Sequence, residues 1–421
     1  MKILVFTTLF PSALEPEHGI FVKTRLQQFL KRHDAEVRVI APVPYSPPFG
    51  PDRWRRYRGV PAAERIDGIE IEHPRFLAIP GFGDGYRARI MAFSLGRYMN
   101  ETVQSFRPDL LDVHYGYPDG VAAWRMRPAL EHALEKPLPM ILTCRGTDLN
   151  LWPSIKGADA EIRAMLESLD QVILVSEALR KKALEFGCPP DRAVTLRNGV
   201  DAVLFSPGDQ AEARSKLGLP ARGKIALMVG NLLEIKGQHL LIDALFRLRR
   251  EQPDANWHGL LVGKGERKAA LEAKAASLGL GEHVIMPGGL PAKDLPDWYR
   301  AADVLVLASS REGWPNVVLE AMASGLPVIG TPVGGVPEIL SGCPAATLVE
   351  RHVEALGEAL LESDKLEAAA ARPHALQHGW ETTVDAMADL FEWRIASAAL
   401  DDVPNPKSAT IDNKKPSEVT L

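Results

Sequence analysis

The chain has 421 residues and a formal net charge of −5 at pH 7, from 49 basic and 54 acidic side chains. This length favours two or more domains, because a single hydrophobic core stops growing at roughly 250–300 residues. A hydrophobic content of 46% and a charged content of 24% exclude a chain that is disordered throughout, and the near balance of charge does not indicate a nucleic-acid-binding protein.

The three cysteines are widely spaced and form neither a disulfide framework nor a metal knuckle, which suits a reducing compartment. The first apolar run is short and is followed by Pro11, so we expect no signal peptide. Stretches of about 20 uncharged apolar residues are absent from the sequence, so we expect no membrane span. The expected location is the cytoplasm.

Short β-branched runs alternate with amphipathic stretches from the first residues onward. The runs predicted to be buried parallel strands are 2–8, 36–41, 110–115, 139–144 and 171–176, and the predicted helices between them are 20–33, 86–106, 117–134 and 178–186. Residues 42–61 are rich in Pro, Arg and aromatic side chains, and we predict that they form a long surface loop.

The same alternation restarts after residue 205. Strands are predicted at 224–230, 257–263, 303–309 and 326–330, and helices at 237–251, 267–278, 294–301 and 316–324. Continuous apolar strands that alternate with helices indicate parallel sheets covered on both faces. The predicted fold class is therefore α/β, with two doubly wound, Rossmann-like domains.

Residues 311–340, REGWPNVVLEAMASGLPVIGTPVGGVPEIL, are the most informative stretch. Glu312 follows a predicted strand, and a helix begins near Asn316. A helix N-terminus offers free amides and a partial positive charge, which suit a diphosphate. Carboxylates such as Glu312 and Glu320 accept two hydroxyls each, so one could hold a ribose and the other a second sugar. Lys236 lies at another helix start, an unfavourable place for a cation unless an anion is nearby.

The pattern E-G-x-P-N-x-x-x-E, followed by A-x-G-x-P-V-I, resembles the paired-glutamate motif of family 4 (group 1) retaining glycosyltransferases, which have the GT-B fold. The resemblance extends over nearly all of residues 1–395, and the chain is similar to bacterial envelope and exopolysaccharide members. The supporting segments are LFPSALEPEHGIFVKTR (9–25), DVHYGYPDG (112–120), TCRGTDLN (143–150), VSEALRKKA (175–183), RNGVD (197–201), VGNLLEIKG (229–237) and LLVGKGER (260–267).

The resemblance implies a role for each matching residue. Glu320 would bind the ribose hydroxyls of the donor. The implied catalytic set is Lys236, which would neutralise the diphosphate, Glu312, which would bind hydroxyls of the donor sugar, and His114, which would approach that sugar near C6. Further donor contacts are expected at Gly19, Asn231, Gly263, Gly265, Gly313, Trp314, Pro315, Asn316 and Val317. Arg145 and Asp148 are candidates for contact with the acceptor or the donor sugar.

Two positions depart from the family pattern. Asn231 stands where Arg is usual, so one cation of the expected phosphate clamp is missing, and Arg145 is the candidate to replace it. His18 precedes Gly19 where paired glycines are usual. Tight backbone packing is a sufficient explanation for Gly334 and Gly335.

The resemblance also implies the domain organisation. An acceptor-side domain would span 1–205, and a nucleotide-sugar-binding domain would span 206–378 across a cleft from it. Residues 379–399 are expected to form a helix that crosses back to the first domain, and 400–421 a disordered tail.

The implied reaction is the transfer of a sugar from a nucleotide-diphosphate sugar to a hydroxyl of a glycan or lipid-linked acceptor, with retention at the anomeric carbon. Both motif glutamates are assigned to hydroxyls, so the sequence offers no clear carboxylate nucleophile, and a front-face reaction is expected. An Asp-x-Asp at a strand end is also missing from the sequence, so we expect neither a metal nor another cofactor.

Residues 1–200 contain 27 basic and 24 acidic side chains, a net charge of 27 − 24 = +3. Together with the aromatic and basic cluster at 54–58 and the basic residues of the first predicted helix, this favours contact with an anionic membrane or a lipid-diphosphate-linked acceptor at the inner face of the cell membrane. The basic residues of that helix are Lys23, Arg25, Lys31 and Arg32.

Two alternatives stay open: a GT-B nucleotide-sugar epimerase, which needs no acceptor, and a non-catalytic protein that binds nucleotide sugars. A nicotinamide-dependent oxidoreductase is excluded because its G-x-G-x-x-G does not follow the first predicted strand.

Overall fold

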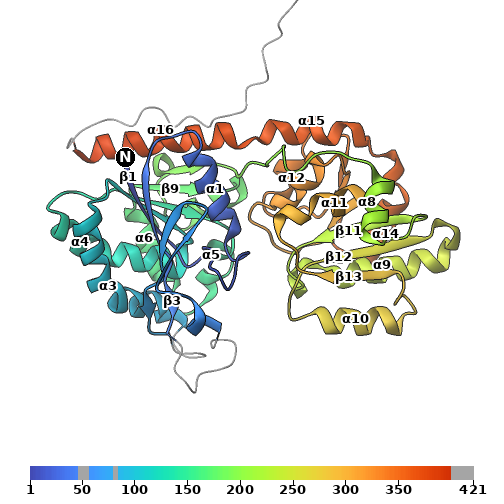
Figure 1. Cartoon of the computed structure of the whole chain (residues 1–421), viewed down its shortest axis with the longest axis horizontal. Coiled ribbons are helices and arrows are strands. Elements are labelled where there is room, and N and C mark those ends of the chain that lie inside the picture. Colours follow the sequence, from blue (N-terminus) through green and yellow to red (C-terminus); the bar gives the residue numbers. More distant parts are fainter. Residues whose placement is uncertain (46–55, 79–83, 400–421) are drawn as a thin grey trace, which may run out of the picture. The chain divides into compact units, whose positions relative to one another are not determined.

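The computed structural model describes residues 1–45, 56–78 and 84–399 of the chain (Figure 1). The chain divides into two compact units. Unit 1 contains Met1–Leu196 and the residues from Val384 onward, and unit 2 contains Arg197–Thr383. The predicted tail at 400–421 and residues 46–55 of the predicted loop lie outside the described residues.

Unit 1 contains an eight-stranded sheet with the strand order β10-β9-β8-β7-β1-β2-β5-β4. Neighbouring strands are parallel, except that β4 and β5 pair antiparallel at one edge. The chain order reverses between β1 and β7, and such a switch point leaves a crevice at the carboxyl ends of the strands. The strands are β1 (Lys2–Phe6), β2 (Glu36–Ile40), β4 (Ala63–Ile66), β5 (Ile69–Glu72), β7 (Leu110–His114), β8 (Met140–Cys144), β9 (Gln171–Leu174) and β10 (Ala193–Thr195).

The longer helices of unit 1 each bury an apolar stripe. In the longest of them, Met91, Leu95 and Met99 recur every four residues and are buried, as expected for a helix that covers a sheet. The helices are α1 (Ile20–Leu30), α3 (Arg87–Phe106), α4 (Val121–Leu134), α5 (Thr147–Asn150), α6 (Asp159–Ser168) and α7 (Glu177–Glu185).

Unit 2 contains a six-stranded parallel sheet with the strand order β13-β12-β11-β14-β15-β16. Its order reverses between β11 and β14, so the first strand of the unit lies beside the fourth. The strands are β11 (Lys224–Val229), β12 (Trp257–Val262), β13 (Val284–Gly288), β14 (Val304–Leu307), β15 (Val328–Gly330) and β16 (Ala346–Leu348).

Helices cover both faces of this sheet. A continuous apolar core lies between the strands and α9, α10 and α14, and it includes Leu245, Leu261 and Leu356. Helices α8, α11 and α12 belong to the other face, where α11 lies against β11 and α12 against β14. The helices of unit 2 are α8 (Gln210–Leu217), α9 (Gln238–Glu251), α10 (Lys268–Ser277), α11 (Pro296–Ala301), α12 (Asn316–Ala323), α13 (Val336–Leu340), α14 (Val353–Leu361) and α15 (Ala371–Ala375).

Helix α16 (Trp380–Ala399) corresponds to the helix expected at 379–399. From Val384 onward it belongs to unit 1, where Asp385 accepts hydrogen bonds from Arg32 at 2.7 and 2.9 Å. The Phe391 ring lies 5.8 Å from that of Phe29 on α1. Both contacts join α16 to α1.

The remaining predicted strands and helices are present, with ends that differ by a few residues. The region after residue 42 was not foreseen: β3 (Val43–Pro44) pairs with β6 (Arg75–Phe76), and Arg56–Gly59 form a short 3-10 helix within the predicted loop. The β4–β5 hairpin was also missed, although Asp67-Gly68 is a strong turn signal and both residues have positive φ.

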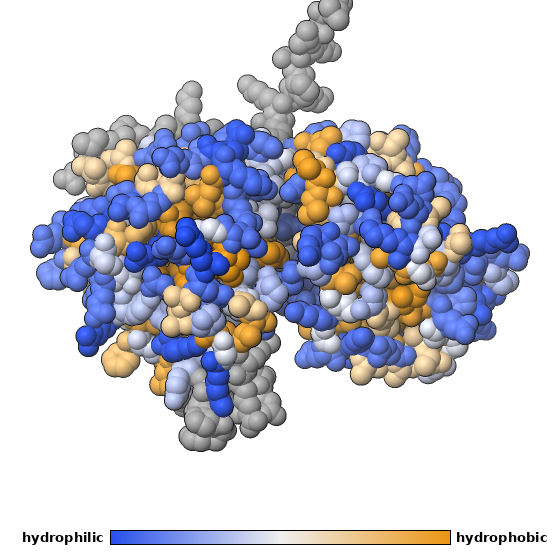
Figure 2. Space-filling model, in the orientation of Figure 1, coloured by the Kyte–Doolittle hydropathy of each residue, from blue (hydrophilic) through white to orange (hydrophobic). Residues whose placement is uncertain are grey.

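The face drawn in Figure 2 is mostly hydrophilic, with hydrophobic residues in separate groups. In the part of the chain that the structure describes, we find no helix whose length and hydropathy would let it cross a bilayer.

Candidate functional site

The predicted site residues fall into two groups, one in each unit. In unit 2 the group lies at the carboxyl ends of β11 and β14, where the strand order reverses. Lys236 follows β11 and Glu312 follows β14, and the Lys236 Nζ lies 2.6 Å from Glu312 Oε1. Ser309 donates a hydrogen bond to the same oxygen, also at 2.6 Å. Two residues 76 positions apart thus form one charged cluster.

Glycines allow the loops of this cluster to approach one another closely. Gly334 has a φ of +55°, and a Cβ there would lie 2.1 Å from the carbonyl oxygen of Glu312. Gly335 donates its amide to the Gly313 carbonyl at 3.0 Å. These contacts agree with the packing role expected for Gly334 and Gly335. The two glycines pack against the backbone of Glu312 and Gly313 and so help to position it.

Helix α12 begins at Asn316, as expected, with Pro315 preceding it. Trp314 is buried, and its indole donates to the Asn198 carbonyl at 3.0 Å. The Asn198 side chain donates to Asn316 Oδ1 at 3.2 Å. Trp314 and Asn316 therefore anchor the helix start, while the first amides of α12, at Asn316 and Val317, have no earlier helical turn to bond to.

Glu320 lies on α12, one turn beyond its start, and is partly buried. Its Oε2 accepts a hydrogen bond from the Tyr299 hydroxyl at 2.7 Å. Loss of hydration raises the pKa of Glu320 to about 7, and the bond from Tyr299 opposes part of that rise. Glu320 therefore changes protonation close to neutral pH.

The Gly263-x-Gly265 segment packs against the loop that follows β11. A Cβ at Gly263 would lie 1.9 Å from the Gly230 carbonyl oxygen, and a Cβ at Gly265 would lie 2.3 Å from that of Leu232. The Gly263 amide donates to Gly288 at 2.8 Å. Backbone packing thus accounts for both glycines. Asn231 has an exposed side chain, and its carbonyl accepts from Gln238.

The unit 1 group lies at the carboxyl ends of β7 and β8. His114 Nδ1 lies 2.9 Å from Arg145 Nη2, and His114 Nε2 lies 3.1 Å from Asp112 Oδ2. Because a guanidinium only donates, Nδ1 must accept and Nε2 must carry the proton that bonds Asp112. Burial lowers the pKa of His114, against the effect of Asp112. His114 is therefore a neutral imidazole with both nitrogens engaged.

Arg145 is likewise held within unit 1. Its guanidinium lies 5.2 Å from the centre of the Phe21 ring, in addition to its bond to His114. Burial lowers the pKa of Arg145 to about 9, and the nearby Arg25 adds to this effect. These contacts occupy the side chain that the sequence nominated to replace the clamp arginine missing at Asn231.

Asp148 stabilises the backbone of the loops around it. Its carboxylate accepts four backbone amides, those of Arg145, Gly146, Leu149 and Gly116, at 2.6–3.2 Å. Burial raises the pKa of Asp148, and the four amides oppose the rise. Asp148 therefore ties the loop after β7 to the loop after β8.

Gly19 caps α1 with a φ of +64°, and a Cβ there would lie 2.2 Å from the Leu9 carbonyl. The close approach at Gly19 is thus to the protein's own backbone. His18 bonds the Thr8 carbonyl at 2.9 Å.

Sequence reasoning missed several polar residues of both groups. Arg25 on α1 is buried, and its three guanidinium nitrogens find no hydrogen-bond partner among the described residues. Its position was a usable signal, because it shares the spacing of the buried Val22, Leu26 and Phe29. Tyr299 carried no comparable signal, since only the folded chain brings it from α11 to Glu320 on α12. Ser309 was missed although it lies three residues before Glu312 on the same loop.

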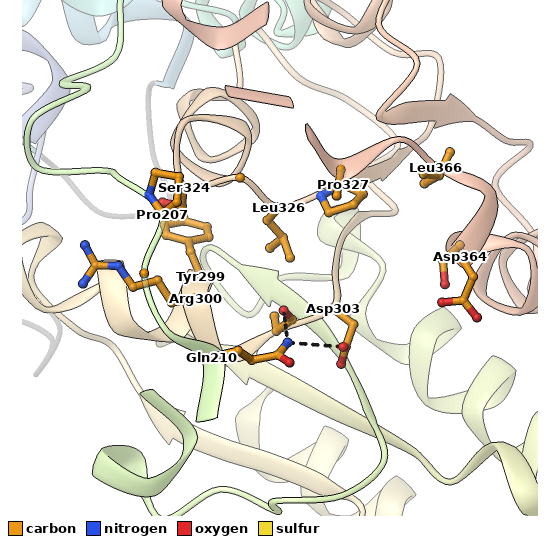
Figure 3. Close-up of a pocket in the computed structure, with 15 residues that line it drawn as sticks. Pro207, Gln210, Tyr299, Arg300, Asp303, Ser324, Leu326, Pro327, Asp364 and Leu366 are labelled. Carbon is orange, nitrogen blue, oxygen red and sulfur yellow. Dashed lines mark hydrogen bonds between the residues drawn. The ribbon is translucent and has the colours of Figure 1, made fainter. Parts of the chain in front are cut away.

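A cavity of about 420 Å³ also lies in unit 2, and it is a different feature (Figure 3). Its lining includes Ala302 and Asp303 just before β14 and Leu326 and Pro327 just before β15. It therefore opens at the amino ends of these strands, opposite to Lys236 and Glu312. Among the described residues, groups of three or more His, Cys, Asp or Glu side chains that could hold a metal ion are not found.

The replacement Glu320→Gln should raise the free energy of unfolding above that of the wild type, and the gain should be larger at pH 8 than at pH 5. Between its ordinary pKa near 4.5 and the folded value near 7, Glu320 is protonated in the folded chain and ionised in the unfolded chain. Wild-type stability therefore falls over this range, and the glutamine variant lacks that fall. Urea unfolding at pH 5, 6, 7 and 8 measures the difference, with the exposed Glu282→Gln as control. A difference that stays constant with pH would contradict the assignment.

Two family models together cover most of the chain. Residues 22–204 match the model described as Glycosyltransferase Family 4, and residues 209–373 match Glycosyl transferases group 1. A Bacillus subtilis (strain 168) protein, TuaC, named as a teichuronic acid biosynthesis glycosyltransferase, is 30% identical over 369 residues, which cover 86% of this chain and 88% of TuaC.

Solved structures share the fold of the chain. Sucrose-phosphate synthase from Thermosynechococcus elongatus has a TM-score of 0.75 at 20% identity, with 94% of this chain and 100% of that chain covered. The HepE protein of Anabaena in complex with UDP-glucose has a TM-score of 0.68 at 19% identity, with 93% and 100% covered. The chain has two largely parallel, doubly wound sheets, and it matches two family models and the relative TuaC. It therefore belongs to the family 4, group 1 glycosyltransferases and has the GT-B fold.

Proposed function

We propose that this glycosyltransferase transfers a sugar from a nucleotide-diphosphate sugar to a hydroxyl of a glycan or lipid-linked acceptor, with retention and without a metal. The observation that carries the proposal is the Lys236–Glu312–Ser309 cluster beside the N-terminus of α12. It offers a cation and helix amides to a diphosphate and a carboxylate to sugar hydroxyls. The UDP-glucose bound to HepE supports the same class of donor.

The residues of unit 2 divide this work between them. When the donor binds, the Lys236 ammonium group turns from Glu312 to the diphosphate. There it stabilises the negative charge that develops as the glycosidic bond breaks. Glu312, once released, accepts hydroxyls of the donor sugar, and Glu320 accepts the ribose hydroxyls. The protein acts mainly by positioning these groups before the reaction.

The protonation and hydrogen bonds of the His114 ring support a front-face reaction. Its basic nitrogen accepts from Arg145 and its other nitrogen donates to Asp112, so the neutral ring offers no free base. The proton of the incoming hydroxyl then passes to the leaving phosphate oxygen, on the face from which that group departs. His114 thus acts through the position of its ring rather than through proton transfer.

An envelope polysaccharide or its lipid-linked precursor is the proposed acceptor class, supported by the name of the relative TuaC. The same inference places the enzyme in the cytoplasm at the inner face of the membrane.

The proposal is tested by a screen of UDP-, GDP- and ADP-sugars in EDTA. A donor at 100 times its Kd should stabilise the fold by about 2.7 kcal/mol. The donor that binds is then left to hydrolyse slowly, and NMR identifies the first anomer of the released sugar. We expect an α-linked donor to release the α-anomer, with turnover unaffected by EDTA.

Other outcomes of this test distinguish the alternatives. Release of the β-anomer, or loss of turnover in EDTA that Mg²⁺ restores, would overturn the retaining, metal-free proposal. Formation of an epimeric sugar without acceptor would identify an epimerase. Binding without turnover in the presence of lipid-linked acceptors would identify a non-catalytic binding protein.

The replacement Lys236→Ala should lower kcat by roughly 10²–10³, the usual effect of removing one preorganised group that stabilises charge. Its loss also leaves Glu312 without its cation. Steady-state kinetics with the identified donor measures the effect, and Lys365→Ala, an exposed lysine of the same unit outside the candidate site, is the control. Unchanged turnover in a folded Lys236→Ala protein would remove Lys236 from the reaction.

Membrane contact is proposed on a surface of unit 1 different from the one the sequence favoured. On α1, Arg25 is buried, Lys23 pairs with Asp67 and Arg32 pairs with Asp385. Trp54 and Arg55 lie outside the described residues. The proposed surface is the exposed side of α3, where the exposed Phe93 carries the proposal. Tyr86, which precedes α3, and Arg89 and Arg97 on α3 are exposed around it and combine an aromatic ring with cations, as interfacial surfaces do. Both arginines are also ion-paired, Arg89 with Glu161 and Arg97 with Glu101.

The replacement Phe93→Ser should weaken binding to vesicles of phosphatidylglycerol and phosphatidylethanolamine by about tenfold, because a Phe side chain gains about 1.5–3 kcal/mol on leaving water. Phe93 is 91% exposed. Co-sedimentation measures the binding. Val203→Ser, at an equally exposed position of unit 2, should have no effect. Equal binding by the wild type and Phe93→Ser would reject α3 as the contact surface.

A further inference from the structure

The Tyr299 phenol lies directly behind the candidate ribose-binding carboxylate. Its ring is fully buried, and its hydroxyl donates to Glu320 Oε2 at 2.7 Å. A buried phenol requires a hydrogen-bond partner, and Glu320 is that partner. Among the described residues, the Tyr299 hydroxyl is the hydrogen-bond partner of the Glu320 carboxylate, and it bonds Oε2. The other oxygen, Oε1, and the remaining lone pairs are therefore available to a ligand.

The phenol is held rigidly by its surroundings. Tyr299 lies on α11, which begins with Pro296, and its ring meets the ring of the buried Phe205 edge-on, with centres 5.8 Å apart and planes at 80°. The same ring underlies the cavity of Figure 3. Polar side chains there are paired locally: Gln210 donates to Asp303 and Arg300 donates to Ser206. The cavity therefore offers Tyr299 no competing partner.

Charged groups on the neighbouring elements are occupied elsewhere. Arg372 of α15 donates to the carbonyls of Ala202, Phe205 and Ala323. Glu338 of α13 pairs with Arg197, and His374 of α15 bonds the Ile339 carbonyl. Burial and the Tyr299 hydroxyl are thus the influences that set the protonation of Glu320.

We propose that Tyr299 is a positioning residue that aims the Glu320 carboxylate at the ribose hydroxyls of the donor and favours its ionised form. The inference rests on the proposed nucleotide-sugar site. A carboxylate that accepts two hydroxyls must be ionised, whereas partial burial favours the neutral acid. The phenol donates to the charged form and offsets part of this cost. Tyr299 itself stays protonated, because burial and the neighbouring Glu320 raise its pKa far above the ordinary value.

The test compares the wild type with Tyr299→Phe, which keeps the ring and removes the hydroxyl. A hydrogen bond to a charged group contributes enough to change an equilibrium roughly tenfold or more. We expect the nucleotide Kd to rise about fivefold at pH 7 and about tenfold at pH 6, and to recover at pH 9, because the midpoint of binding moves upward from about 7 by about one pH unit. In turnover, KM for the donor should rise while kcat changes little, since the ribose contact is equal in the ground and transition states.

Two further variants separate positioning from simple packing. Tyr98→Phe removes a phenol that also donates to a glutamate, Glu72, and should shift neither the midpoint nor Kd. In a Glu320→Gln background, Tyr299→Phe should leave nucleotide binding independent of pH and nearly unchanged, because the two side chains act as one unit. An unshifted midpoint in Tyr299→Phe, with only a lower Tm, would overturn the proposal and leave Tyr299 a packing residue.

Failure of the proposed function would be recognised separately. If the wild type and Glu320→Gln bound nucleotides equally, the ribose-binding role of Glu320 would be rejected. The positioning role of Tyr299 would be rejected with it. The pairing of the two side chains would still be measured without nucleotide. The pH dependence of unfolding reports the protonation of Glu320, and Tyr299→Phe should shift it upward.

Discussion

The reversal of strand order between β11 and β14 is the constraint on which the unit 2 site depends. Because both strands are parallel and adjacent, the loops that follow them emerge side by side, and Lys236 reaches Glu312 across 76 residues of sequence. Gly334 and Gly335 then hold the backbone of Glu312 and Gly313. The charged cluster thus follows from topology, and α12 adds its N-terminus at the same edge of the sheet.

In unit 1, loops that follow adjacent parallel strands also bring ionisable side chains together, but here they produce a neutral histidine. At the ends of β7 and β8, burial of His114 between Asp112 and Arg145 produces a neutral ring with a defined tautomer. Asp148 contributes by accepting four amides, which joins the two loops. Ionisable groups here serve mainly to position one another. In unit 2, burial raises the pKa of Glu320 to about 7, so this carboxyl group changes protonation near neutral pH.

Three glycines illustrate the difference between a motif and its role. Gly19 and the Gly263-x-Gly265 segment were nominated as donor contacts, and each is explained by the close approach of protein backbone. Such glycines shape the loops that carry Lys236 and the first residues of α1. Their contact with a donor stays a prediction, and their packing role is a finding.

The sequence alone determined the family, the parallel α/β architecture and the candidates Lys236, Glu312 and Glu320, because apolar periodicity and motif spacing are local properties. The β4–β5 hairpin was also readable from Asp67-Gly68, and that signal was overlooked. Only the tertiary structure decided that Tyr299 bonds Glu320 and that Lys236 reaches Glu312. These contacts join residues from separate elements, and burial, which sets protonation, exists only once those elements pack.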